Sequence, residues 1–142
     1  MTSHQLDDFP IHTFDKVRYG DTDRQGHVNN AVFSTYLETG RVHVLHSPGQ
    51  HFADSGCEFV IAHLSLDYLG ELHWPGTVEI GTRVGTFGRS SVTLEQALFQ
   101  NGQCAAFAKS VVVQIDTSTR QSRALSDEAR ARLQALVKPE QA

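Results

Sequence analysis

Two carboxylates lie two residues apart in a segment of turn-forming residues, residues 20–27 (GDTDRQGH). A carboxylate can attack a carbonyl carbon directly, or it can take a proton from a water molecule that attacks instead. Asp21 and Asp23 are therefore candidates for nucleophilic or general-base chemistry. Aspartates also stabilise turns by bonding to nearby backbone groups, and spacing alone favours that structural role.

A helical pattern follows this turn directly. Apolar residues recur at three- and four-residue steps over residues 32–45, which predicts one long amphipathic helix. We expect Asn29 or Asn30 to cap its start and residues 47–50 (SPGQ) to end it. The start of a helix offers unpaired N–H donors and about half a positive charge. A negative oxygen that develops on a bound carbonyl would be stabilised there.

Most of the chain after this helix is predicted to be strand. Asn101-Gly102, between two alternating runs, predicts a type I′ hairpin turn. Ser126 is expected to cap a short amphipathic helix near the end of the chain. Four runs alternate or are rich in β-branched residues, and these are residues 57–69, 77–87, 90–100 and 103–116.

A further strand is predicted before the carboxylate turn, at residues 12–19. Its alternation suggests that Phe14, Val17 and Tyr19 face the interior or an interface. Residues 1–10 show no such pattern, and we expect them to form a loose arm. The remainder then belongs to the single domain that residues 1–142 are long enough to build.

The order of these elements predicts an α+β fold. One strand, one long helix, four antiparallel strands and a short helix can bury a common core if the sheet curls around the long helix. This arrangement is the hotdog fold. The strands at the edges of such a sheet invite pairing with a second copy, so we expect a homodimer or a homotetramer.

Composition excludes several classes of function. The formal net charge of −4 argues against a nucleic-acid-binding protein, which needs a concentrated basic face. No run approaches the ~20 apolar residues that span a bilayer, so no membrane association is expected. The first ten residues, MTSHQLDDFP, do not resemble a signal peptide. With only two cysteines, we expect a cytoplasmic protein with reduced thiols.

Three other segments are interpreted as structural. His43 and His46 lie three residues apart on the predicted helix, but no third ligand is spaced to complete a zinc site. Residues 88–91 (GRSS) lack the second glycine of a nucleophile elbow. Residues 73–76 (HWPG) precede a predicted strand and are interpreted as a turn. We therefore expect no metal site and no cofactor.

The carboxylate turn resembles a known family. Asp21-Thr22-Asp23, then residues 26–30 (GHVNN), then Tyr36, Glu38 and Arg41, closely resemble the 4-hydroxybenzoyl-CoA thioesterase-like family, in its acyl-CoA thioester hydrolase branch. The dense match covers about the first third of the chain, and the later strands are similar in order and length. This resemblance implies a hotdog fold and hydrolysis of an acyl-CoA thioester to a free acid and CoA.

The resemblance also assigns roles to individual residues. It implies that Asp23 is the catalytic nucleophile or general base and that the backbone N–H of Asn30 faces the thioester carbonyl. Gly26, His27 and Asn29 match the motif, and they are expected to contact substrate or to shape the turn. At the position of an expected tyrosine the chain has Phe33, so one hydroxyl on the helix is missing.

Several assignments stay open after this comparison. Arg89 is the best candidate to bind the phosphates of CoA, at the surface between subunits. Glu38 and Arg41 match the family, but a pair at i, i+3 on the helix would explain them equally well. In another hotdog lineage the catalytic acid is on the central helix, a role that Glu38 could fill. The alternative functions are a thioesterase acting on acyl carrier protein and a non-catalytic acyl-CoA-binding protein.

Overall fold

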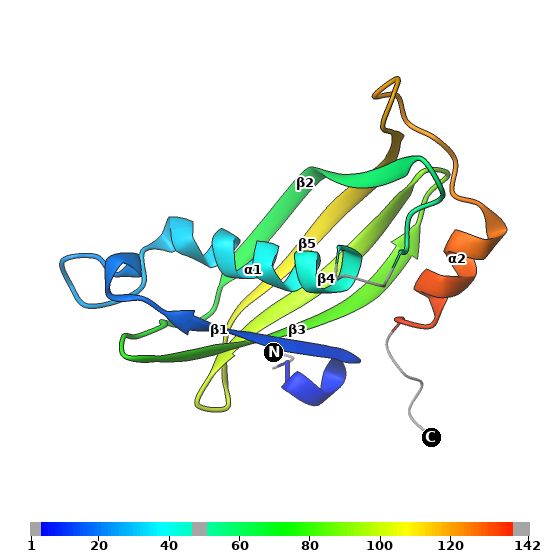
Figure 1. The fold of residues 1–142 in the computed structure, drawn as a ribbon. Coiled ribbons are helices and arrows are strands. Elements are labelled where there is room, and N and C mark those ends of the chain that lie inside the picture. The colour runs from blue at the N-terminus through cyan, green and yellow to red at the C-terminus, as the bar shows by residue number, and fades with distance from the viewer. Residues whose placement is uncertain (1–3, 47–50, 138–142) are drawn as a thin grey trace.

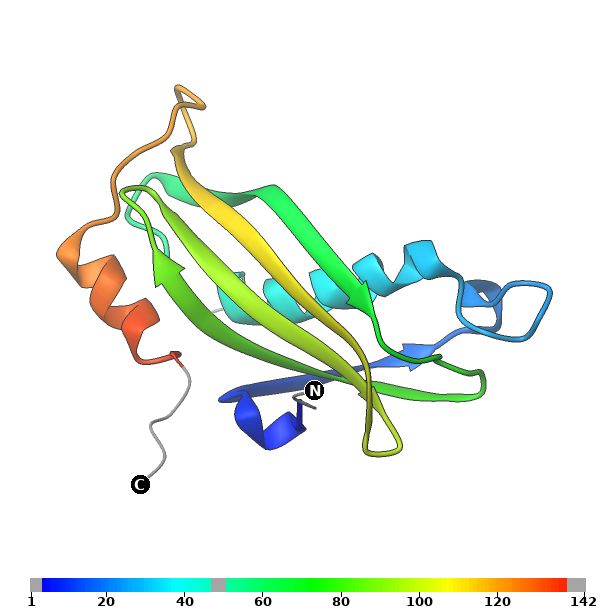
Figure 2. The same ribbon diagram turned by 180° about the vertical axis from the view of Figure 1, so that it is seen from behind.

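Five strands form one antiparallel sheet in the order β1-β3-β4-β5-β2 in the computed structural model, which describes residues 4–46 and 51–137 (Figure 1). The long helix α1, Asn30–Leu45, lies across one face of the curved sheet, and this arrangement confirms the predicted hotdog fold (Figures 1 and 2). The strands are β1 (Ile11–Val17), β2 (Cys57–Tyr68), β3 (Gly76–Phe87), β4 (Ser91–Gln100) and β5 (Gln103–Asp116).

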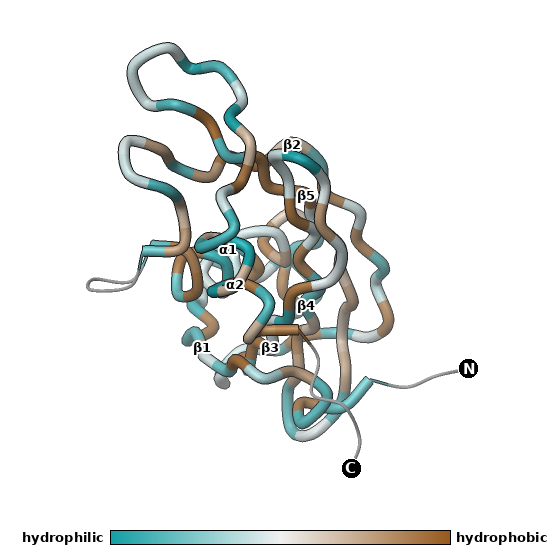
Figure 3. Tube along the Cα trace, turned by 90° about the vertical axis from the view of Figure 1, so that its right-hand side faces the viewer, coloured by the Kyte–Doolittle hydropathy of each residue, from teal (hydrophilic) through white to brown (hydrophobic). Residues whose placement is uncertain are grey.

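The four predicted strands after α1 are confirmed to within one residue at each end. Apolar and polar residues are interspersed along them, as a view turned by 90° shows (Figure 3). The two strands β4 and β5 are joined by Asn101 and Gly102, whose φ angles of 52° and 79° are those of the predicted type I′ turn. In β4, Leu94 and Leu98 pack in the clusters that include α1, whereas Ala97 and Phe99 pack on the other face.

The helix α1 packs closely against the sheet at Gly40. A Cβ atom there would lie 2.6 Å from both the Gln96 Nε2 and the Ile80 Cγ2 atoms, so only glycine fits without a shift. The buried Gln96 amide donates to the Leu37 carbonyl oxygen at 3.0 Å and to the Thr82 hydroxyl at 3.1 Å. These bonds satisfy a polar side chain in the core and attach α1 to β3 and β4.

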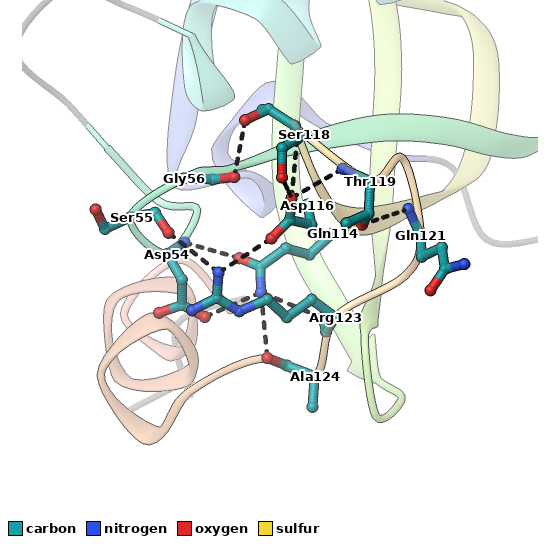
Figure 4. A network of polar contacts seen from close by, with 11 residues as sticks. Asp54, Ser55, Gly56, Gln114, Asp116, Ser118, Thr119, Gln121, Arg123 and Ala124 are labelled. Carbon is teal, nitrogen blue, oxygen red and sulfur yellow. Dashed lines mark hydrogen bonds and ion pairs between the residues drawn. The ribbon is translucent and has the colours of Figure 1, made fainter.

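The short helix α2, Asp127–Gln134, begins where predicted, because the Ser126 hydroxyl accepts the Ala129 N–H at 3.0 Å. Asp54 holds this cap by accepting bonds from the Ser126 N–H and hydroxyl and, at 2.9 Å, from the Gln114 amide. The same Gln114 amide reaches the Ala124 carbonyl (Figure 4). This polar network joins α2 to β5 at one end of the molecule.

The beginning of the chain differs from the expected loose arm. Leu6–Asp8 form a short 3-10 helix, and Phe9 is only 2% exposed against the outer face of the sheet. The Arg83 guanidinium lies 4.7 Å from the centre of the Phe9 ring. One aromatic anchor therefore orders residues 4–10, while residues 1–3 lie outside the described part of the chain.

The first strand is shorter than predicted, because the chain leaves the sheet at Val17 and turns at Tyr19–Asp21. Val17 is fully buried, as expected, but Phe14 and Tyr19 are 68% and 72% exposed in the single chain. The predicted stop of α1 at residues 47–50 lies outside the described residues. Within the two described ranges, no helix has the length and hydrophobicity needed to cross a membrane.

Candidate active site

The segment with the two carboxylates folds into a closed turn at the start of α1. The Asp23 N–H donates to the His27 carbonyl oxygen at 2.8 Å, and the Gly26 N–H donates back to the Asp23 carbonyl oxygen at 3.1 Å. Thr22 and Val28 pair as an isolated antiparallel bridge. Gly26 has a φ angle of +84°, which a residue with a side chain rarely adopts. Backbone hydrogen bonds therefore fix the shape of this turn.

Asp21 attaches this turn to α1 and to the residue after β1 through hydrogen bonds. Its carboxylate accepts the Arg18 N–H at 2.9 Å and the Tyr36 hydroxyl at 2.6 Å, and its carbonyl oxygen accepts the Asn29 N–H at 2.8 Å. Burial, together with the bond to the Asp21 carboxylate, raises the pKa of the Tyr36 phenol far above its usual value. Tyr36 therefore remains a donor to Asp21, and the Asp21 carboxylate is held by its neighbours.

The Asp23 carboxylate is in a different environment. Asp23 is exposed, and its side chain accepts one bond, from the Gln25 N–H to Oδ1 at 2.8 Å. Among residues 4–46 and 51–137, no group donates to the other oxygen, Oδ2. The bonds to the Asp21 carboxylate both end on Oδ2, so the two carboxylates differ in exposure and in partners: the Asp21 side chain is 15% exposed and bonds to Tyr36, whereas Asp23 is exposed and bonds only to a neighbouring backbone N–H in the described chain.

The start of α1 has a backbone donor available beside the turn. Asn29 is the N-cap, since its side-chain oxygen accepts the Ala31 N–H at 3.0 Å, while its carbonyl oxygen accepts the Val32 N–H at 2.9 Å. In the described chain the N–H of Asn30 meets no acceptor. The bond between the Asn29 N–H and Asp21 attaches this helix start to the turn that carries Asp23.

A hydroxyl that the sequence did not suggest lies at the same helix start. The Tyr68 hydroxyl, from the end of β2, donates to the Asn30 carbonyl oxygen at 2.9 Å. Its ring meets the Phe33 ring edge to face, with 5.0 Å between centres. Tyr68 thus brings a hydroxyl near the helix face where Phe33 lacks one. No local motif marks Tyr68, because its partner is 38 residues away.

The other two predicted site residues, His27 and Arg89, lie at opposite ends of the molecule. His27 is in the turn, beside Glu71 and His73 of the connection between β2 and β3. The segment that carries Arg89 joins β3 to β4 beside α2, at the end opposite the Asp23 turn (Figures 1 and 2). One chain does not bring Arg89 to Asp23, so contact with the same ligand would require a second copy.

The family-matched pair on α1 does not form an ion pair within the described residues. Arg41 is 9% exposed, and its nearest polar contact is the Gln96 side-chain oxygen at 3.5 Å. Burial lowers the pKa of its guanidinium, partly offset by the charge of Glu38. Arg41 is therefore a core residue, and Glu38 remains exposed on the helix.

A large groove reaches Tyr68 from another part of the molecule. It has a volume of about 1010 Å³ and is lined by residues of the N-terminal segment and of β2, β3, β4 and β5, including Leu6, Phe99 and Phe107. These three side chains pack on the face of the sheet opposite α1. None of the predicted site residues lines this groove.

Comparison with known proteins identifies the family of this chain. Residues 17–133, from the end of β1 through most of α2, match the family model described as the thioesterase-like superfamily. The chain belongs to the thioesterase-like superfamily. This finding confirms the family resemblance of the carboxylate turn and extends it across strands β2 to β5.

Solved structures of other proteins share the fold of this superfamily member. A thioesterase from Thermus thermophilus, complexed with coenzyme A and Zn, is 32% identical, with a TM-score of 0.80 over 94% of this chain and 98% of that one. The PA5185 protein from Pseudomonas aeruginosa is 26% identical, with a TM-score of 0.83 over 99% of this chain and 100% of that one.

A curated relative extends the comparison to plants. It is a chloroplastic acyl-acyl carrier protein thioesterase from Arabidopsis thaliana, 29% identical over 113 residues. The match covers 76% of this chain and 60% of the relative. This superfamily member therefore spans less than two thirds of the length of that plant protein.

Proposed function

We propose that the protein hydrolyses an acyl-CoA thioester, with Asp23 as the catalytic carboxylate and the N-terminus of α1 as the oxyanion site. The observation that carries this proposal is that two groups able to contact a substrate lie on segments that are bonded to each other. Asp23 Oδ2 and the Asn30 N–H have no partners among the described residues, and hydrogen bonds join the segments that carry them. Membership of the thioesterase-like superfamily supports it.

The chemistry needs only these groups and water. Asp23 attacks the thioester carbon, or it removes a proton from a water molecule that attacks. The carbonyl oxygen becomes negative, and the Asn30 N–H donates to it; one such donor typically lowers the barrier by about 3 kcal/mol. The C–S bond then breaks and the CoA sulfur leaves as a thiolate that takes up a proton. In the direct route, water then hydrolyses the acyl-Asp23 anhydride.

One observation supports a CoA thioester as the substrate, and the turn suggests which residues contact it. The Thermus thermophilus relative is a thioesterase complexed with coenzyme A, and it is 32% identical to this chain. We propose that Gly26, His27 and Asn29 line the approach to Asp23, since all three belong to the same turn. Arg89 would bind CoA phosphates only across a subunit boundary.

The first test is the substitution Asp23→Asn, which keeps the size of the side chain and removes its charge. We expect thiol release from acyl-CoA esters to fall by about 10²–10⁴-fold, the usual contribution of a catalytic acid or base. Binding of acyl-CoA and the melting temperature should change little, because Asp23 is exposed. Asp7→Asn, another exposed carboxylate, is the matched control and should keep full turnover.

Retention of parental turnover by Asp23→Asn would exclude Asp23 as the catalytic group. The two routes are separated by rapid-quench kinetics on the parent enzyme. If Asp23 attacks carbon, a burst of free thiol precedes release of the acid. If Asp23 activates water, thiol and acid appear together.

A second candidate is a thioesterase that acts on acyl carrier protein. The Arabidopsis relative, which carries that activity in its name, favours this alternative. The same acyl group presented on CoA and on carrier protein separates the two: the higher kcat/KM identifies the substrate. A non-catalytic acyl-CoA-binding protein would instead bind CoA esters saturably and release no thiol from either one.

We also propose a cytoplasmic location and a homodimer or homotetramer. The location rests on the composition and on the reduced state expected of its two cysteines, both of which are free. The assembly rests on the open edge of β2, which pairs only with β5 in the described chain.

A further inference from the structure

Three side chains of types that can bind metals lie close together beside the Asp23 turn. His27 comes from the turn itself, while Glu71 and His73 come from the connection between β2 and β3, more than forty residues later. One potential ligand atom of each residue lies within 4.8 Å of those of the other two. The cluster joins two segments that are distant in sequence, so no spacing motif reveals it.

The two distances from Glu71 to the histidines fall within ion-pair range and also agree with the spacing of donor atoms around a metal ion. The Glu71 Oε2 atom lies 3.3 Å from His27 Nε2 and 3.4 Å from His73 Nε2. Both distances exceed the usual upper limit of about 3.2 Å for the N···O separation in N–H···O bonds. Tetrahedral zinc, with bonds of about 2.0–2.2 Å, holds adjacent donor atoms about 3.3–3.6 Å apart.

The backbone beneath the cluster is held in position. His27 and His73 pair as an antiparallel bridge, and the neighbouring Val28 N–H donates to the Leu72 carbonyl oxygen at 2.8 Å. The Gln100 side chain bonds to His73 twice. It accepts the His73 N–H and donates to the His73 carbonyl oxygen, both at 2.9 Å. The two segments that carry the three side chains are thus bonded to each other and to β4.

We propose that His27, Glu71 and His73 form a binding site for a divalent transition metal, with zinc as the preferred ion. Two imidazoles and one carboxylate suit zinc, whereas calcium and magnesium favour oxygen ligands. Glu71 and His73 are 57% and 54% exposed in their side chains, so a fourth position is open to water. This inference does not depend on the proposed hydrolase activity.

A metal in this site would link two segments of the chain. It would connect the turn that carries Asp23 to the connection between β2 and β3, through one ligand on the first and two on the second. Because the ion binds the folded arrangement of these segments, it would raise the thermal stability of the protein as its concentration rises.

The test is zinc binding to the full chain after removal of any affinity tag and of bound metal with a chelator. Isothermal titration with zinc chloride should give one zinc per chain, and zinc should raise the melting temperature. In His73→Ala and in Glu71→Gln, the affinity should fall by at least about tenfold, which is the smaller effect seen even for outer-shell partners of metal ligands.

His51→Ala is the matched control, since His51 is an exposed histidine outside the cluster. It should bind zinc as the parent does. Circular dichroism spectra verify that each variant is folded. The proposal is overturned if the parent binds no zinc, or if His73→Ala and Glu71→Gln both bind it with parental affinity.

Discussion

Asp21 and Asp23 illustrate how two identical side chains in one turn come to differ. Asp21 accepts bonds from a backbone N–H and from the buried Tyr36 hydroxyl, so its carboxylate is structural. Asp23 is exposed, and in the described chain its side chain accepts a bond only from the nearby Gln25 N–H. The Asp21 carboxylate is thus attached to α1 through Tyr36, while the Asp23 carboxylate faces the solvent.

The residue-scale prediction concerns Tyr36→Phe. Losing a hydrogen bond to a carboxylate should lower the free energy of unfolding by about 1.5–3 kcal/mol, as measured by urea denaturation. Turnover should fall less than in Asp23→Asn, because the Asp21 carboxylate keeps its bond to the Arg18 N–H.

The difference in stability between the parent and Tyr36→Phe should depend on pH in one direction. The folded-state pKa of Tyr36 lies above that of an unfolded tyrosine, about 10. Its stabilising contribution is complete below about pH 10 and is lost as the pH rises through the folded-state value. The stability gap between parent and Tyr36→Phe should be constant from about pH 6 to 9 and shrink in more alkaline solution; a constant gap at all pH values would contradict this account.

At this scale the sequence reveals some site residues and hides others. The Asp-x-Asp pattern and the paired asparagines identify Asp23 and the helix start, because turn chemistry and capping are local. Tyr68 and His73 are missed, since their partners lie 38 and 46 residues away. Such contacts depend on strand register and on the connections between strands, which local patterns do not specify.

Elements with strong local signals were predicted well. The four later strands, the hairpin at Asn101-Gly102 and the Ser126 cap follow from alternation, turn chemistry and capping. The order in residues 4–10 was missed because it rests on one buried residue, Phe9, packed on a distant strand. The position of Arg41 in the core was missed for a similar reason, since Gly40 lets α1 approach the sheet closely.

The element-scale prediction concerns the anchor of α2. Burial opposes the charge of Asp54, but bonds from Ser126 and from the Gln114 amide outweigh it and hold the pKa of Asp54 below its usual value. Asp54→Asn places an amide donor among these donors, so the protein should lose about 1.5–3 kcal/mol at pH 7. The loss should be seen as a lower melting temperature.

The sign of the pH effect follows from the lowered pKa. The contribution of Asp54 is present above the unfolded value of about 4 and is lost as the pH falls through the folded-state value. The difference in melting temperature between parent and Asp54→Asn should therefore narrow below about pH 4. The kcat for thiol release at low temperature should be unaffected, because α2 lies at the end of the molecule opposite the turn at residues 20–27 (Figure 1). A difference that widens in acid would contradict this interpretation.

At the scale of the whole molecule, the two edge strands of the sheet differ in length. β1 and β2 are the outer strands, and each pairs with one neighbour in the described chain. β2 is the longer of the two and exposes Ile61, which is 48% exposed. A long edge strand with exposed apolar residues favours pairing with another copy.

The prediction at this scale is that the protein associates through β2. Light scattering after size exclusion should give twice the 15.7 kDa of one chain, or four times if two dimers associate. Ile61→Lys should shift the mass toward that of one chain. Phe14→Lys, at an exposed apolar residue of β1, is the control and should keep the parental mass. A monomeric parent would disprove association, and dissociation by Phe14→Lys alone would assign the contact to β1.

The length of α1 has a practical consequence. Its first residue adjoins the Asp23 turn and its last turn packs with α2, so the two features are separated by 16 helical residues, about 24 Å. A surface, a dye or a fused reporter joined after α2 would therefore sit far from the turn. Tethered in that orientation, the protein would present the turn to the solution, which suits immobilised or single-molecule turnover measurements.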